Sequence, residues 1–153
     1  MDNRKKLNDV SIALIVLAAC DLFSFFGTLL VKYFDGTFES ALPEASASVI
    51  TIAVIILLVF GAIVTGAQIL IGYKGYKESK NPTGAKGYIT AAYIFWVIAI
   101  LGVVTSAVSV FKATGTDSIV NGISVISVAL DVCIYGMFIT EAKKLRKSTD
   151  KNA

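Results

Sequence analysis

The stretch that decides the fold is SIALIVLAACDLFSFFGTLLV, residues 11–31, in which Asp21 is the single charged side chain. A helix needs roughly 20 apolar residues to cross about 30 Å of hydrocarbon, so this stretch is long enough to span a membrane. Lipid offers no partners to the backbone amides, and a helix pairs all of them within one segment. Strands of a membrane barrel would alternate apolar with polar residues, and this stretch does not. The sequence therefore predicts a transmembrane helix.

Three further runs of the same character follow, at residues 47–72, 88–111 and 119–140. The first of these has 26 residues. At about 1.5 Å per residue it is longer than the hydrocarbon is thick, so we expect it to tilt or to emerge from the bilayer. The four runs predict an all-α, polytopic membrane protein, in which residues 1–153 form a single membrane domain built as a four-transmembrane-helix bundle.

The composition excludes other classes of protein. The chain is 56% hydrophobic and only 16% charged, with a mean hydropathy of +0.75. A soluble domain of 153 residues has too small a core to bury so much apolar surface. An intrinsically disordered chain would be less apolar and more charged. The net charge of +3 does not indicate a nucleic-acid partner, because no basic face alternates with aromatic residues outside the apolar runs.

The basic residues predict the orientation. Twelve of the fourteen Lys and Arg residues lie before the first run, between the second and third, or after the fourth. Such residues are enriched in cytoplasmic loops, so we expect both termini to be cytoplasmic (N-in/C-in) in a multi-pass protein of the cell membrane, either a bacterial inner membrane or a plasma membrane. The first run is longer than the apolar core of a signal peptide and contains an acid, so we expect it to be retained.

The central link GYKGYKESKNPTGAKG, residues 72–87, carries several glycines and an Asn-Pro pair. These residues favour a turn over a continuous helix. Basic residues at this depth can bind anionic lipid headgroups, although they also act simply as determinants of topology. The candidate headgroup residues are Lys74, Lys77, Lys80 and Lys86.

Two acids lie deep within the runs, where ionisable residues are costly and therefore informative. Asp21 is about 15 Å from the inner start of its run, and Asp131 is about 14 Å from the inner end of the fourth. The first and fourth spans run in opposite directions, so they could pack side by side with the two carboxyl groups at one height. Two carboxylates so placed cannot both be ionised cheaply.

Each acid lies on a polar stripe, and the second and third runs also have narrow faces of small or polar residues. We therefore expect a closed bundle with these faces inward, held by close packing and by hydrogen bonds between helices. Helical spacing groups the candidate substrate- or ion-binding residues with the two acids. They are Asp21, Ser24, Thr28, Gln68, Asn121, Ser124, Asp131 and Tyr135.

Three interpretations of the acid pair stay open at this point. The two carboxyl groups could share a proton or hold a cation, each could be protonated and bond a neighbouring helix, or one could pair with a basic residue in a partner's span. The four runs contain no Lys or Arg to serve as a counter-ion.

No pattern predicts a metal, a cofactor or catalysis. The chain has no histidine, and Cys20 and Cys133 are far apart in sequence. We expect each cysteine to be a small packing residue, and no nucleophile–base pair or metal-ligand set is present. We therefore expect the protein not to be an enzyme and to need no cofactor.

Two functions remain. The first is a non-enzymatic accessory, immunity-type or scaffold subunit, acting within the bilayer on lipid, on a partner membrane protein or on further copies of itself. It is favoured because neither outer link is large enough to fold as a domain. The alternative is a small proton- or cation-coupled transporter or channel that uses Asp21 and Asp131.

Overall fold

The computed structural model describes residues 3–112 and 116–150, and the side chains of residues 3–108 and 125–150. The helices are α1 (Asn3–Phe34), α2 (Thr37–Ala41), α3 (Ala47–Lys80), α4 (Gly87–Lys112) and α5 (Thr116–Asp150). Within these ranges the chain forms no strand. Four of the helices are long and apolar enough to cross a membrane. The all-helical structure and the four long helices confirm the predicted fold class. Each predicted span lies within one of these four helices.

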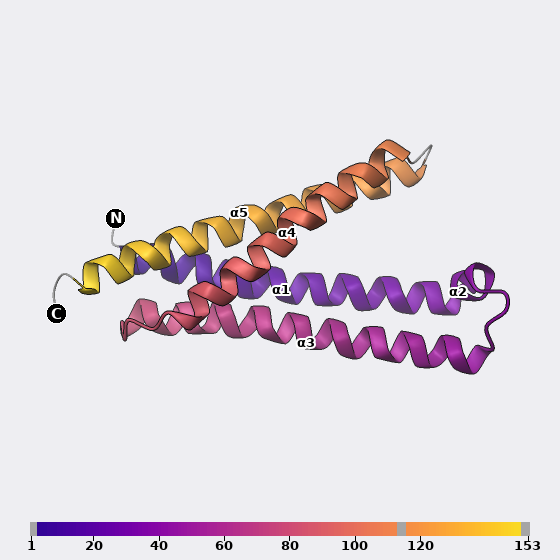
Figure 1. The fold of residues 1–153 in the computed structure, drawn as a ribbon, viewed down its shortest axis with the longest axis horizontal. Helices are drawn as coiled ribbons and strands as arrows, with labels where there is room; N and C mark the ends of the chain where they lie inside the picture. Colours follow the sequence, from indigo (N-terminus) through magenta and orange to yellow (C-terminus); the bar gives the residue numbers. More distant parts are fainter. Residues whose placement is uncertain (1–2, 113–115, 151–153) are drawn as a thin grey trace.

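The four long helices form two antiparallel pairs, α1 with α3 and α4 with α5 (Figure 1). The beginning of α1, the end of α5 and the link 81–86 lie at one end of the molecule, which we name the terminal end. The short helix α2 lies at the opposite end, which we name the loop end. The two pairs meet toward the terminal end, where α1 also packs against α5, and they diverge toward the loop end.

Three of the helices continue well beyond the apolar runs at the terminal end. The prediction that Gly72 and Gly75 belong to a turn is wrong, because both lie inside α3. A Cβ atom at Gly72 would lie 2.7 Å from Cγ1 of Ile15, and one at Gly75 would lie 2.4 Å from Cε2 of Phe138. These glycines therefore let α3 approach its neighbours closely rather than breaking the helix.

The turn itself is shorter than predicted and follows α3 directly. It begins at Asn81, which precedes Pro82, and a residue before proline is disfavoured in the helical conformation. Gly84 has a φ of 74°, in the left-handed region that glycine adopts without strain. Six residues, 81–86, thus connect α3 to α4.

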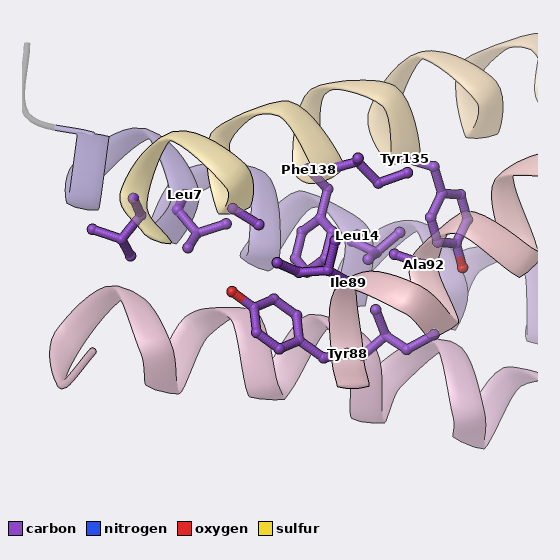
Figure 2. Close-up of a cluster of buried hydrophobic side chains, with 11 residues drawn as sticks. Leu7, Leu14, Tyr88, Ile89, Ala92, Tyr135 and Phe138 are labelled. Atoms are coloured by element: carbon purple, nitrogen blue, oxygen red, sulfur yellow. The ribbon is translucent and has the colours of Figure 1, made fainter. Parts of the chain in front are cut away.

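The core lies at the terminal end (Figure 2). Leu7, Ala92 and Phe138 are fully buried there, and they come from α1, α4 and α5. Figure 2 shows Phe138 reaching from α5 toward Leu14 and Ile89, with the ring of Tyr88 close by. The rings of Tyr88 and Phe138 meet edge to face, with centroids 5.9 Å apart. Side chains from separate helices thus interlock at this end.

The loop end is packed much more loosely. Among the described side chains of residues 22–58, 98–108 and 125–130, only Leu29, Ile50 and Val54 are buried. All three belong to the α1–α3 pair. The predicted closed bundle is therefore wrong for this end, where the pairs stand apart. Lipid tails solvate apolar side chains as well as a neighbouring helix does, so these faces have no hydrophobic reason to close.

Candidate functional site

The two intramembrane acids lie next to one another. The side chains of Asp21 on α1 and Asp131 on α5 lie near enough to interact directly, and both residues are half-buried. Two carboxyl groups so close together can form a hydrogen bond only when one of them carries a proton. The pair therefore suits a single negative charge that shares one proton.

Two matching stripes of residues bring the acids together. On α1 the buried residues Leu7, Ser11, Leu14 and Ala18 lead to Asp21 with spacings of four and three residues. On α5 the residues Asp131, Tyr135, Phe138, Ala142 and Leu145 repeat the same spacings. This repeat keeps one face of each helix toward its partner. The acids occupy the last positions of these stripes, at the point where the packed terminal end gives way to the open loop end.

A cavity of about 380 Å³ adjoins the pair between α3, α4 and α5. Three residues supply its polar side chains: Gln68, Asp131 and Tyr135. Its other walls are apolar and are formed by Phe60, Val64, Phe95, Ile98, Ala99, Gly102 and Val128. A largely apolar pocket with a few converging polar groups is the usual form of a binding site.

Tyr135 lines the cavity on the side nearer to the terminal end of the molecule. The residue is 1% exposed, and its ring stacks on that of Phe95 with the planes 12° apart. Gln68 lies near enough to interact with the Tyr135 hydroxyl, but their geometry is outside that of a hydrogen bond. The hydroxyl is thus a buried donor beside Asp131, held in place by the packing of its ring.

The other predicted polar residues lie elsewhere. Ser24 and Thr28 are exposed on the loop side of Asp21, and neither lines the cavity. They are exposed because the two helix pairs diverge toward the loop end, so α5 no longer covers this part of α1 (Figure 1). The side chains of Asn121 and Ser124 lie outside those that the structure describes. Of the predicted set, the structure brings together Asp21, Gln68, Asp131 and Tyr135.

The candidate headgroup residues lie together at the terminal end. Lys74, Lys77, Lys80 and Lys86 are all exposed, the first three on the last two turns of α3. The ammonium group of Lys80 lies 4.6 Å from the ring centroid of Tyr76. This arrangement is compatible with a lipid surface, and the headgroup role stays a prediction.

The cysteines take no part in the site. Cys20 and Cys133 are free and exposed, so the expectation that each is a small packing residue is wrong. Among the residues described, no group of three or more acidic or cysteine side chains is arranged to hold a metal ion.

Sequence reasoning missed the apolar walls of the cavity. Phe60, Phe95 and Val128 are ordinary residues of an apolar run, and nothing in the sequence distinguishes them from lipid-facing neighbours. It also missed Glu141, a buried acid that follows the fourth run directly. In the sequence, a glutamate three residues before a lysine is typical of an exposed ion pair on a helix. The pattern therefore does not reveal that Glu141 is buried.

No protein family matches the chain, and no significant similarity to a curated protein or to a solved structure was found. The function is therefore inferred from the fold and from the acid pair.

Proposed function

We propose that this small integral membrane protein carries protons or small monovalent cations across the bilayer, without catalysis, and that Asp21 and Asp131 are the shared binding pair. The single observation that supports this most is the contact between the two carboxyl groups beside the cavity. Intramembrane acids that pair with one another are typical of ion pathways and proton relays.

The charge of the pair favours a small cation. With one shared proton the two groups hold a single negative charge, and the spans provide no Lys or Arg to neutralise it. A second proton or a monovalent cation would neutralise that charge. Oxygen atoms of Asp131, Gln68 and Tyr135 could coordinate such a cation from the cavity.

The shape of the molecule supports a mechanism in which an ion reaches the acid pair from one side of the membrane at a time. The core between Leu7 and Phe138 closes the terminal end, whereas the pairs diverge toward the loop end (Figure 1). The acids lie at the boundary between the two. A change in how the helix pairs meet would open the closed side, as alternating access requires.

The direct test is flux through reconstituted protein. Liposomes with an imposed potential should acidify, or accumulate Na⁺ or K⁺, only when the protein is present. Asp21→Asn combined with Asp131→Asn should abolish the flux, while Asp9→Asn, an exposed acid at the terminal end, should leave it unchanged. Thermal unfolding in detergent would establish that the double variant is folded. Unchanged flux in a folded double variant would exclude the proposal.

A second measurement examines the pair without relying on flux. A protonated carboxyl group absorbs in the infrared at a frequency well separated from that of a carboxylate. The wild type should show this band at neutral pH, and Asp131→Asn should remove or shift it. A wild type with only ionised carboxylates and no bound cation would contradict the shared charge.

A second candidate function is that of an accessory or scaffold subunit. The observation that favours it is the separation of the helix pairs at the loop end, which leaves apolar faces such as those of Phe60 and Leu101 exposed. A span of a partner protein, or of another copy, would cover them. Affinity isolation in mild detergent should then recover a stoichiometric companion, and recovery of the chain alone would count against this candidate.

We also propose that the terminal end faces the cytoplasm of a cell whose inner or plasma membrane contains the protein. The bias of the basic residues supports this orientation. Reporters fused after Asp150 that are active only inside or only outside the cell would distinguish the two orientations.

A further inference from the structure

A second hollow lies between α4 and α5, separate from the cavity beside Asp131. It is a groove of about 610 Å³, and it shares no lining residue with that cavity. Several of its residues, among them Cys133, Met137 and Thr140, are exposed, so it opens on the outer surface of the α4–α5 pair. Its remaining walls are Tyr93, Trp96, Val132, Gly136, Ile139 and Glu141.

The groove extends from the middle of the membrane to its boundary. Asp21 is the central residue of the run 11–31, and Asp131 is in contact with it, so both lie near the midplane. Glu141 is ten residues beyond Asp131. At about 1.5 Å per residue it lies about 15 Å from the midplane, which is the edge of a hydrocarbon layer about 30 Å thick. The groove therefore matches the length of an acyl chain in one leaflet.

Most of the polar groups in the groove are already satisfied. The indole nitrogen of Trp96 donates to the carbonyl oxygen of Val132 at 3.0 Å. The hydroxyl of Thr140 donates to the carbonyl oxygen of Gly136 at 2.8 Å. The walls therefore present apolar surface to whatever occupies the groove.

Glu141 is the exception. The residue is 9% exposed, and its Oε1 atom accepts a hydrogen bond of 2.7 Å from the ammonium group of Lys144. Its Oε2 atom is buried and has no hydrogen-bond partner among the described residues. A buried acceptor without a donor is costly, and more so when it is charged. Glu141 lines the groove, so a ligand that brings a donor to this end would remove that cost once a change of side-chain rotamer exposes the Oε2 atom.

Two lysine ammonium groups lie near the same end of the groove. The ammonium group of Lys143 lies 4.9 Å from the ring centroid of Tyr93, and that of Lys144 is beside Glu141. A ligand that fits this end thus combines a hydrogen-bond donor with a negative group. A phospholipid with a primary ammonium headgroup has both, attached to an acyl chain of the right length.

We propose that the groove between α4 and α5 binds one phospholipid with a primary ammonium headgroup, such as phosphatidylethanolamine. Its ammonium group donates to Glu141, its phosphate lies near Lys143 and Lys144, and an acyl chain fills the groove toward Trp96. A choline headgroup has the same phosphate but no N–H to donate, so the site discriminates against it. This site is independent of the function proposed for the acid pair.

Native mass spectrometry of the purified full chain tests the proposal. The protein is mixed with equimolar phosphatidylethanolamine, phosphatidylglycerol and phosphatidylcholine, and the lipid retained per protein is measured. Phosphatidylethanolamine should be retained over phosphatidylcholine by on the order of tenfold, the ratio that a charge-assisted hydrogen bond gives. Phosphatidylglycerol retained more strongly than phosphatidylethanolamine would overturn the assignment of an ammonium donor.

Two variants locate the site. Glu141→Gln should reduce the preference to near unity, whereas Glu44→Gln, an exposed acid of the outer link, should leave it unchanged. Met137→Trp adds bulk at an exposed position of the groove and should lower retention of all three lipids. Equal retention of the three lipids by the wild type, or an unaltered preference in Glu141→Gln, would overturn the proposal. Thermal unfolding of each variant establishes that it is folded.

Discussion

Both ends of the molecule are rich in apolar side chains, but only the terminal end packs them between several helices. At the terminal end, side chains from different helices interlock around Phe138, and glycines in α3 allow the backbones to approach closely. At the loop end, the only buried side chains among those described lie between α1 and α3. Burial in a membrane protein therefore depends on shape more than on hydrophobicity, because lipid is as apolar as leucine. Small residues beside large rings produce the packed end.

The largest predicted effect on stability comes from removing the ring at the centre of the packed end. Phe138→Ala should lower the free energy of unfolding by on the order of 3 kcal/mol, near the lower limit for such truncations because lipid adds no hydrophobic term. Phe23→Ala, at a ring that is 77% exposed, should change it by less than about 0.5 kcal/mol. Denaturant titration in detergent measures both. Equal effects would refute the contrast between the two ends.

A smaller effect is predicted for the glycines. Gly75→Ala places a Cβ atom 2.4 Å from the buried ring of Phe138 and 2.7 Å from Oγ of Ser11, and should destabilise the protein by roughly 1–3 kcal/mol. Gly66→Ala is the matched control on the same helix, since its Cβ atom would meet nothing within 4 Å. It should be neutral or slightly stabilising, because alanine favours helix. The midpoints of thermal unfolding would rank the two variants, and a stable Gly75→Ala would indicate that α3 is not held tightly.

Each end also contains a threonine that donates to a carboxylate. Thr83 donates from its backbone and its hydroxyl to the buried Glu78, and Thr37 donates in the same way to the exposed Asp35. Thr83→Val should cost about 1–2 kcal/mol, since a hydrogen bond to a buried charge is lost. Thr37→Val should have little effect on unfolding, because water replaces the lost hydroxyl. Denaturant titration of the two variants makes the comparison, and a larger cost for Thr37→Val would reverse it.

The smallest predicted effect is a change in the pKa of Asp35 at the loop end. Hydrogen bonds from Thr37 hold the pKa of Asp35 below its ordinary value of 3.8. These bonds favour the charged form of Asp35. Their contribution to the free energy of unfolding is therefore present above the ordinary pKa and is lost as the pH falls through the lowered pKa of the folded state. NMR titration should show the midpoint of Asp35 rising toward 3.8 in Thr37→Val. An unchanged midpoint would mean that the hydroxyl does not bond the carboxylate in solution.

Much of the fold was predictable because hydrophobic length is a strong signal. The four apolar runs correctly predicted four helices, and the depth of Asp21 and Asp131 correctly suggested that the first and last spans meet. The ends of the helices were not predictable in the same way. Gly72 and Gly75 favour a turn by local propensity, and only the neighbouring Ile15 and Phe138 explain why they are helical.

The candidate site was predictable only in part. A stripe repeating every seven residues on α1 and α5 was present in the sequence and ends at the two acids, so it could have placed Tyr135 and Phe138 toward α1. Spacing along one helix does not reveal which neighbour a face meets, and for this reason Ser24 and Thr28 were assigned inward. The cavity and the groove depend on how apolar surfaces fit, which no residue type indicates.

The arrangement in two antiparallel pairs has a consequence for biogenesis. Each pair consists of two long helices that follow one another in the chain. The helices α1 and α3 can therefore assemble before α4 has been synthesised. Docking of the two halves then needs only the contacts at the terminal end. A chain cut within residues 81–86 should consequently reassemble when its two fragments are co-expressed, because that link is a covalent tether rather than part of the interface.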